Sequence, residues 1–309
     1  MGKSESSDIP KRQNVIKSTV TLKNLRLMLD TLSMYSVDIM LDINDSTWSC
    51  STKDSTNTRI FVVDFDRPYF VAMHVEPPKR GISHKILIAS DALKKIRFSG
   101  NPDRTMVDID IDTIDAGCVR RYILMITSGQ RSYSILSLSD DMNKNVTPHK
   151  KIVLPGGFTV ELDTAELRAA TMCAKRLSDL VTLGAVYSQR TKLWKMFMCS
   201  GHSRRECSHD DYRPDSRELD MYEWFRIRPD TLEVDKNAVI EIQYPKVDTV
   251  VSSSVSVSFF ELPVKIFSKY FSTVAIEFGV DRPIVFSPAG DEVSGFTVYY
   301  AAAPRIEVG

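Results

Sequence analysis

The chain has 309 residues, and its 40 Lys plus Arg balance its 40 Asp plus Glu, so the formal net charge is zero. This balance excludes a globally basic nucleic-acid binder, and any contact with phosphate has to come from cations gathered on one surface. The length favours two domains with separate cores, and no window reaches the roughly 18 consecutive apolar residues of a membrane span.

Five Cys residues are scattered along the chain, and no apolar signal segment stands at its start. An odd number of cysteines without such a segment predicts an intracellular, reducing environment. A soluble protein that does not contact membranes is expected.

The first domain is expected at residues 18–138, after a polar segment at 1–17 whose lack of any period predicts a disordered tail. An amphipathic helix is expected at 22–35, with Lys23 and Arg26 on its outer side. Short polar turns then separate four strand-like runs of a β-meander, at 37–43, 47–51, 59–64 and 69–76.

A second helix is expected at 91–98, where Ser90 offers an N-cap and Leu93 and Ile96 point inward. Its outer side carries three cations, Lys94, Lys95 and Arg97. Three further strands are expected at 106–112, 121–127 and 131–138. The first domain therefore has the order helix, strands, helix, strands.

A polar segment at 139–156 shows neither the helical nor the strand period of apolar residues, and it predicts an extended connector. The second domain, at 157–303, repeats the pattern of the first. Its first helix is capped by Asp163 or Thr164, with Glu166 placed for the reciprocal bond of a capping box. The outer face of this helix carries Arg168, Lys175 and Arg176.

Strands at 180–187 and 193–199 follow this helix, and a charged insertion at 203–236 comes next. The fourth helix is expected to hold Pro263 in its first turn, where proline is tolerated. Lys265 and Lys269 lie one turn apart on its outer face. The remaining strands are expected at 238–244, 255–260, 275–280 and 284–286, before a terminal strand and a tail at 304–309.

The four helices share a basic outer face. For any one of them, charged residues are the ordinary state of a solvated helix. Together they carry few acidic residues, and Glu261 is expected in the first turn of the fourth helix, where it complements the dipole. Cations on equivalent helices of a repeated unit favour phosphate contact that is independent of sequence, since no helix-turn-helix, zinc finger or RNP sequence is present to read bases.

The C-terminal sequence resembles the end of DNA sliding clamps of the proliferating-cell-nuclear-antigen (PCNA) type. Those chains end in a Tyr-Tyr strand, then Ala-Pro, a basic residue, Ile and Glu, which Tyr299, Tyr300 and the run from Ala303 to Glu307 match. The repeated order of helices and strands, with a connector between, is similar to a whole clamp protomer over residues 18–307.

This resemblance implies an α+β fold of two tandem clamp-type domains, each with antiparallel sheets and two helices on the inner face, that assemble into a ring. It implies a non-enzymatic DNA polymerase processivity factor, without a cofactor, that encircles duplex DNA and recruits replication and repair proteins. A homotrimer, a clamp loader and a nuclear location, or a viral replication site, are implied as well. The helix cations would line the DNA channel: Lys23, Arg26, Lys94, Lys95, Arg97, Arg168, Lys175, Arg176, Lys265 and Lys269.

The resemblance also implies a docking site for short partner peptides beneath the connector. Its residues would be Lys53, Asn57, Thr58, Lys144, Val146, Thr147, Ala303, Pro304, Arg305 and Ile306. This chain departs from the family here, because its first-domain loop is more polar and its connector lacks the usual acidic and aliphatic run. The subunit seam would pair two edge strands through Tyr133, Ile135 and Leu138 of one chain and Ala238, Ile240 and Ile242 of the next.

Two alternatives stay open. The first is a checkpoint-type clamp subunit or a viral processivity factor that does not form a closed homotrimer. The second is a metal-dependent DNA-processing enzyme, which would use a Cys/His loop or the alternating Asp108, Asp110 and Asp112. The loop ligands would be Cys199, His202, Cys207 and His209, although their spacing is not that of a common zinc finger and Arg204 and Arg205 oppose a cation. Alternating aspartates are also typical of the solvent-exposed face of a half-buried strand.

Overall fold

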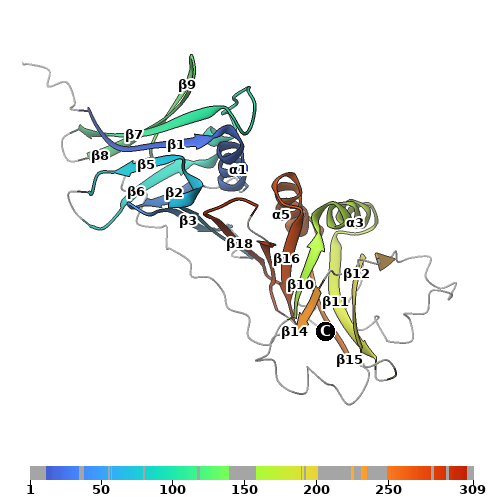
Figure 1. The fold of residues 1–309 in the computed structure, drawn as a ribbon. Coiled ribbons are helices and arrows are strands. Elements are labelled where there is room, and N and C mark those ends of the chain that lie inside the picture. Colours follow the sequence, from blue (N-terminus) through green and yellow to red (C-terminus); the bar gives the residue numbers. More distant parts are fainter. Residues whose placement is uncertain are drawn as a thin grey trace, which may run out of the picture. The chain divides into compact units, whose positions relative to one another are not determined.

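The computed structural model describes residues 12–34, 38–54, 56, 58–78, 81–116, 119–138, 158–188, 190, 193–200, 224–225, 231–234, 249–279, 282–289 and 292–304 (Figure 1). The chain forms two compact units. The first comprises 1–52, 63–149 and 293–296, and the second comprises 53–62, 150–292 and 297–309. Residues 53–62 therefore belong to the second unit, and residues 293–296 belong to the first, unlike their neighbours in the sequence.

The first unit contains a five-stranded antiparallel sheet in the order β5-β1-β7-β8-β9. Its strands are β1 (Arg12–Thr21), β5 (Ala72–Val75), β7 (Met106–Ala116), β8 (Val119–Ser128) and β9 (Arg131–Leu136). A second group of strands has the order β4-β3-β2-β6. It is made of β2 (Asp38–Ile43), β3 (Thr47–Lys53), β4 (Arg59–Asp66) and β6 (His84–Ala89).

Strand β1 overturns part of the predicted disordered tail, because residues 12–17 belong to it. Val15 and Ile16 are 3% and 0% exposed, and β1 pairs with both β5 and β7. The register shifts between Asn14 and Ile16, which is a bulge that places two consecutive residues in the core. This shift breaks the two-residue period that marks a strand in a sequence.

The helical segments of the first unit are shorter than predicted. Helix α1 (Leu22–Leu32) is capped by the Thr21 side chain, which accepts a hydrogen bond from the Asn24 amide, and it ends before Tyr35. Helix α2 (Ser90–Leu93) has a single turn, and Ser90 does not cap it because Ala89 holds the cap position. Beyond it the amide of Ile96 bonds to the Leu93 carbonyl, so the chain continues in tight turns that still bury Ile96.

A loop from the C-terminal part of the chain, residues 293–296, packs in the first unit. The Gly295 carbonyl accepts the Asp66 amide at 2.7 Å, and the ring of Phe296 lies 5.7 Å from that of Phe65. Gly295 has a φ of +70°, and a Cβ on it would come within 2.5 Å of the Tyr69 nitrogen. Only glycine fits this close approach without a backbone shift.

The second unit has two groups of antiparallel strands, in the orders β14-β10-β16-β17-β18-β4 and β13-β12-β11-β15. Residues 59–62 of β4 belong to this unit. The first group contains β10 (Phe158–Asp163), β14 (Thr231–Val234), β16 (Thr273–Phe278), β17 (Ile284–Ala289) and β18 (Phe296–Ala302). The second contains β11 (Leu180–Ser188), β12 (Leu193–Ser200), β13 (Trp224–Phe225) and β15 (Thr249–Ser256).

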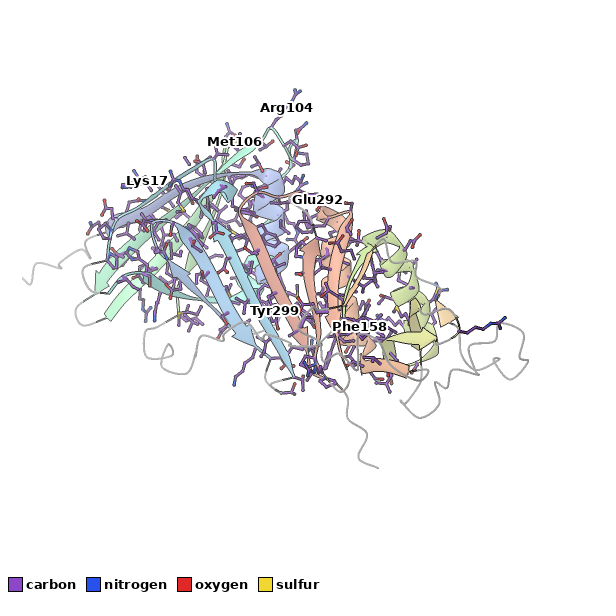
Figure 2. The ribbon with its side chains drawn as sticks, turned by 60° about the horizontal axis from the view of Figure 1, so that its bottom comes forward. Lys17, Arg104, Met106, Phe158, Glu292 and Tyr299 are labelled. Carbon is purple, nitrogen blue, oxygen red and sulfur yellow. The ribbon has the colours of Figure 1, made fainter. Side chains whose placement is uncertain are left out.

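Aromatic side chains fill the core of the second unit. Phe158 of β10 stacks on Phe278 of β16, and Phe260 meets Phe286 edge to face at 4.8 Å between ring centroids (Figure 2 labels Phe158). Strands β13 and β14 lie inside the segment predicted as a charged insertion, so part of 203–236 is sheet. The predicted strand at 238–244 lies outside the described residues.

Helix α3 (Thr164–Leu177) begins as predicted, since the Asp163 carboxylate accepts the amides of Ala165 and Glu166, both at 2.8 Å. Helix α5 (Val257–Tyr270) does not begin as predicted. The strand expected at 255–260 is wrong beyond Ser256, where β15 ends and the helix starts. Pro263 therefore lies inside the helix and not in its first turn, and Glu261 lies beyond the first turn as well.

Candidate nucleic-acid interface and docking site

Helices α3 and α5 pack side by side in the second unit (Figure 1). Leu167 and Ala174 of α3 and Phe260 and Phe267 of α5 are buried, which fixes the opposite faces to point away from the sheets. The exposed cations are Arg168, Lys175 and Arg176 on α3 and Lys265 and Lys269 on α5. Five basic residues thus stand against two acidic ones, Glu166 and Glu261, over the two helices.

Lys175 is engaged by an acidic side chain. Its Nζ lies 3.0 and 2.8 Å from the two carboxylate oxygens of Glu261, which comes from α5. The side chains are 58% and 36% exposed, so the pair is screened by solvent and contributes little to stability. Glu261 lowers the positive potential where Lys175 was predicted to act.

The first unit carries the other five predicted cations on α1 and on residues 90–98. The Arg26 guanidinium donates to the Phe98 carbonyl at 3.1 Å and so ties α1 to that segment. Arg97 donates to the Ile96 carbonyl at 2.7 Å, and Lys94 pairs with Asp91 at 2.8 Å. This ion pair holds the pKa of the Asp91 carboxyl below its usual value. Arg26, Lys95 and Arg97 are exposed, whereas Lys23 and Lys94 are half-buried.

The three aspartates of β7 bind protein groups. Asp108 accepts the Thr19 hydroxyl at 2.8 Å, and Asp112, only 5% exposed, pairs with Arg12 and accepts the Asn14 side chain at 2.8 Å. Burial, followed by the nearby Asp108 carboxylate, raises the pKa of Asp110. These carboxylates belong to a sheet face with its own partners.

Within the described residues, no three His, Cys, Asp or Glu side chains gather closely enough to hold a metal ion. Cys199 lies on β12, while His202, Cys207 and His209 fall outside the described part of the chain. Burial, with the Asp64 carboxylate adding to it, raises the pKa of the Cys50 thiol to about 12, so this thiol stays protonated. No helix of the described residues is long and apolar enough to cross a membrane.

The predicted docking residues that the structure describes gather at one end of β18. The Ala303 amide donates to the Thr58 carbonyl at 2.7 Å, which brings the start of the C-terminal tail beside the loop before β4. Pro304 has no amide hydrogen to extend this pairing. Lys53 is exposed at the end of β3. Asn57, Lys144, Val146, Thr147, Arg305 and Ile306 lie outside the described residues.

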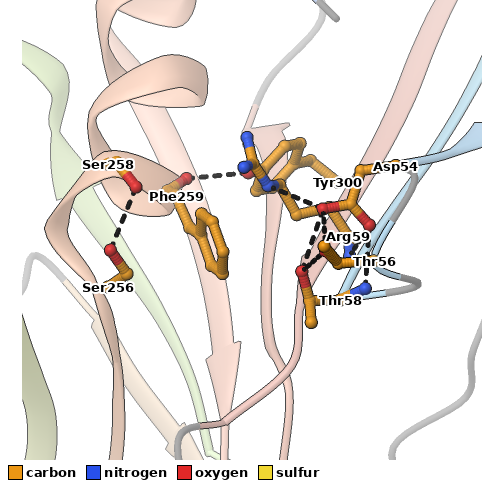
Figure 3. A network of polar contacts seen from close by, with 8 residues as sticks. All are labelled: Asp54, Thr56, Thr58, Arg59, Ser256, Ser258, Phe259 and Tyr300. Carbon is orange, nitrogen blue, oxygen red and sulfur yellow. Dashed lines mark hydrogen bonds and ion pairs between the residues drawn. The ribbon is translucent and has the colours of Figure 1, made fainter. Parts of the chain in front are cut away.

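Asp54 organises this loop through a network that the sequence alone did not predict (Figure 3). Its Oδ1 accepts the amides of Thr58 and Arg59 at 2.8 and 3.0 Å, and its Oδ2 accepts the hydroxyls of Thr56 and Thr58 at 2.7 and 2.9 Å. Burial opposes ionisation of Asp54, but the bonds from Thr56, Arg59 and Thr58 outweigh it and hold the pKa below its usual value. An aspartate before a Ser/Thr/Asn run is the local signal for such a turn.

The sequence alone also did not predict an apolar cluster that lies next to the Asp54 loop. Val285, Tyr299 and Ala301 are buried together, and Ile60 and Val62 of β4 pack against them (Figure 2 labels Tyr299). Successive strand residues face opposite sides of a sheet, and Tyr300 on the other side packs against Phe286. The run from Val298 to Ala302 is therefore apolar on both faces, and this lack of alternation was the available signal.

The predicted subunit seam is described on one side only. Strand β9 stands at one end of the described order of its sheet, and it carries Tyr133 and Ile135. Leu138 lies beyond the strand, and its amide bonds to the Leu87 carbonyl at 2.9 Å. Ala238, Ile240 and Ile242 lie outside the part of the chain that the structure describes.

The chain matches known proteins in structure and not in sequence. No protein-family model matches the chain, and no curated protein matches its sequence. Solved structures match along nearly its whole length. PCNA of A. fulgidus, bound to the C-terminal region of FEN-1, is similar with a TM-score of 0.64 at 14% identity, over 95% of this chain and 100% of that one.

Two further structures give the same result. PCNA of Thermococcus kodakaraensis matches with a TM-score of 0.65 at 14% identity, over 94% of this chain and 100% of that one. The proliferating cellular nuclear antigen of Entamoeba histolytica matches with a TM-score of 0.63 at 10% identity, over 95% and 100%. The two-domain fold of antiparallel sheets and few helices, predicted from the resemblance in sequence, is therefore confirmed, and the chain has the PCNA-like clamp fold.

Proposed function

We propose that the chain is a DNA sliding clamp, a non-enzymatic ring that encircles duplex DNA without sequence preference and keeps a DNA polymerase on its template. The observation that carries the proposal is the basic face on equivalent helical segments of both units. Each pair of segments, α1 with 90–98 and α3 with α5, has five basic residues against two acidic ones in a chain of zero net charge. Phosphate contact of this kind is independent of sequence and lets a protein slide.

The assembly proposed with this function is a homotrimer, loaded by a clamp loader in the nucleus or at a viral replication site. Two clamp-type units per chain would give six around the ring. Strand β9 of one chain would pair at the seam with residues 238–243 of the next. Because the A. fulgidus PCNA structure holds the C-terminal region of FEN-1, we propose that this chain likewise docks peptides of replication and repair proteins. The docking residues would be those at the end of β18.

Charge reversal on α3 tests the channel assignment. Replacing both Arg168 and Arg176 with Glu should abolish the stimulation of primer extension by a cognate polymerase. The new carboxylates would repel the DNA phosphates that the proposal places against this helix. The control variant reverses Lys85 and Arg121, which are exposed on strands β6 and β8. If the α3 variant stimulated extension like the native protein, the channel assignment would be refuted.

The mass in solution tests the assembly. A closed homotrimer has three times the mass of the 35.0 kDa chain, and light scattering distinguishes it from a monomer or dimer. A smaller mass at concentrations that support function would favour the checkpoint-type or viral clamp that does not close into a homotrimer.

A further inference from the structure

Arg59 joins the proposed docking loop to helix α5, and its surroundings differ from those of an ordinary surface arginine. Its side chain is 21% exposed, and its Nε lies 3.2 Å from the Asp54 carboxylate. Its guanidinium carbon lies 4.0 Å from the ring centroid of Phe259, a residue of α5 (Figure 3). An arginine stacked on an aromatic face and paired with a carboxylate is held in a single orientation.

The Asp54 carboxylate transmits this orientation to the loop. Four hydrogen bonds reach it from Thr56, Thr58 and the Arg59 amide, so that residues 54, 56, 58 and 59 share one anchoring group. The Thr58 carbonyl in turn accepts the Ala303 amide. A chain of contacts thus runs from α5 through Arg59 and Asp54 to the first residues of the C-terminal tail.

Phe259 is itself held by a residue near the end of strand β18. The Tyr300 hydroxyl donates to the Phe259 carbonyl at 2.8 Å, and Tyr300 is fully buried on β18. The aromatic face that Arg59 covers and the strand that continues into Ala303 are therefore set by one group of contacts (Figure 3). All of these residues belong to the second compact unit.

We propose that Arg59 is a positioning residue for partner docking, and that it preorganises Asp54, Thr56, Thr58 and Ala303 to receive an apolar peptide of a client protein. The proposal rests on the proposed function, since it assumes that peptides dock at this end of β18. A site held in its bound conformation binds more tightly because the peptide does not have to order the loop. Arg59 does not need to touch the peptide.

Peptide affinity and amide exchange test the proposal together. The probe is a fluorescein-labelled synthetic peptide with the sequence of the FEN-1 C-terminal region that is bound in the A. fulgidus PCNA structure. Arg59→Ala should raise its dissociation constant about 5- to 30-fold, mainly through faster dissociation. The Ala303 amide should exchange with solvent about tenfold faster, because a looser loop opens more often. Arg121→Ala, an exposed arginine of the first unit, is the control and should change neither quantity.

Conservative variants separate positioning from folding. Arg59→Lys keeps a cation for Asp54 but loses the planar stack, so it should restore part of the affinity. Phe259→Leu removes the aromatic face and keeps an apolar side chain, and combining it with Arg59→Lys should add little further loss. Both remain informative if Arg59→Ala does not fold.

The outcomes distinguish the two proposals. Native affinity and native Ala303 exchange in Arg59→Lys and Phe259→Leu would overturn the positioning role. If the native protein did not bind the peptide at all, docking at this site would be refuted, and the exchange of Ala303 would still report whether Arg59 holds the loop.

Discussion

The strongest energetic prediction concerns Pro263 inside helix α5. In a continuous helix the amide of residue 263 would bond to the carbonyl of Phe259, four residues earlier, but proline has no amide hydrogen. The Tyr300 hydroxyl lies 2.8 Å from that carbonyl and donates to it. A residue 41 positions away along the chain thus supplies the hydrogen bond that the proline removes from the helix.

Tyr300→Phe should therefore destabilise the protein by about 1–3 kcal/mol, the usual penalty for leaving a buried polar group unpaired. Tyr300 is 0% exposed, so water does not readily replace the hydroxyl. The matched control is Tyr133→Phe, whose hydroxyl donates to the Arg97 carbonyl at 2.9 Å in an exposed setting. Because water can substitute there, the control should lose less than about 0.5 kcal/mol.

A double-mutant cycle isolates the cause. Pro263→Ala restores an amide that can bond to the Phe259 carbonyl, so Tyr300→Phe in that background should lose at least about 1 kcal/mol less than in the native chain. The assay is urea unfolding followed by circular dichroism at a fixed protein concentration, with equal m-values required across the four proteins. Equal losses in the two backgrounds would refute the assignment of the Tyr300 hydroxyl to the proline gap.

Three further predictions concern charge. Glu261→Gln should release Lys175 toward phosphate, strengthen duplex binding several-fold in fluorescence anisotropy, and steepen the dependence of log K on log salt by about 0.9 per added phosphate contact; an unchanged slope would contradict it. Because the Asp54 pKa is lowered, its contribution to stability is present above its unfolded pKa and is lost as pH falls through the folded value. Asp54→Asn should therefore destabilise the protein near pH 7 and become equivalent to the native chain in strong acid, as thermal unfolding between pH 2 and 7 would show. Asp110 has a raised pKa, so its ionised form opposes folding. Asp110→Asn should therefore stabilise the protein by about 0.5 kcal/mol near pH 7, and should give no gain at a pH below the pKa of Asp110 in the unfolded chain. An equal gain at the neutral and the acidic pH would argue against a charge effect.

Local patterns were enough to predict most of the elements. The buried stripe of α3 and its cap at Asp163 are encoded within a few residues, and the cations of its outer face are exposed as expected. The start of α5 was misread because the alternation of Ser with Val and Phe at 254–259 favours a strand, and Pro263 suggested a later helix start. Tertiary packing of Phe260 against Phe286 outweighs that local preference.

The candidate site was predictable only in part, for a different reason. Its cations lie on periodic helices, but the ion pair between Lys175 and Glu261 joins residues 86 positions apart. Arg59 and Phe259, which stack on each other, are separated by a still longer stretch of chain. No local period encodes such contacts, because they depend on which elements the fold brings together.

Although the net charge of the chain is zero, its basic and acidic residues are distributed unevenly. This distribution bears on how a clamp would slide along DNA. The helical segments at 22–32, 90–98, 164–177 and 257–270 carry ten of the forty basic residues but only four of the forty acidic ones. The rest of the chain is therefore net acidic and would repel phosphate, which would confine DNA to the helical faces in the proposed clamp. Because Glu261 and Asp91 each engage one lysine there, the remaining attraction would come mainly from exposed, solvent-screened cations. In the proposed clamp, such screened contacts would hold duplex DNA loosely enough to exchange one phosphate for the next, whereas tighter pairing would stop the motion.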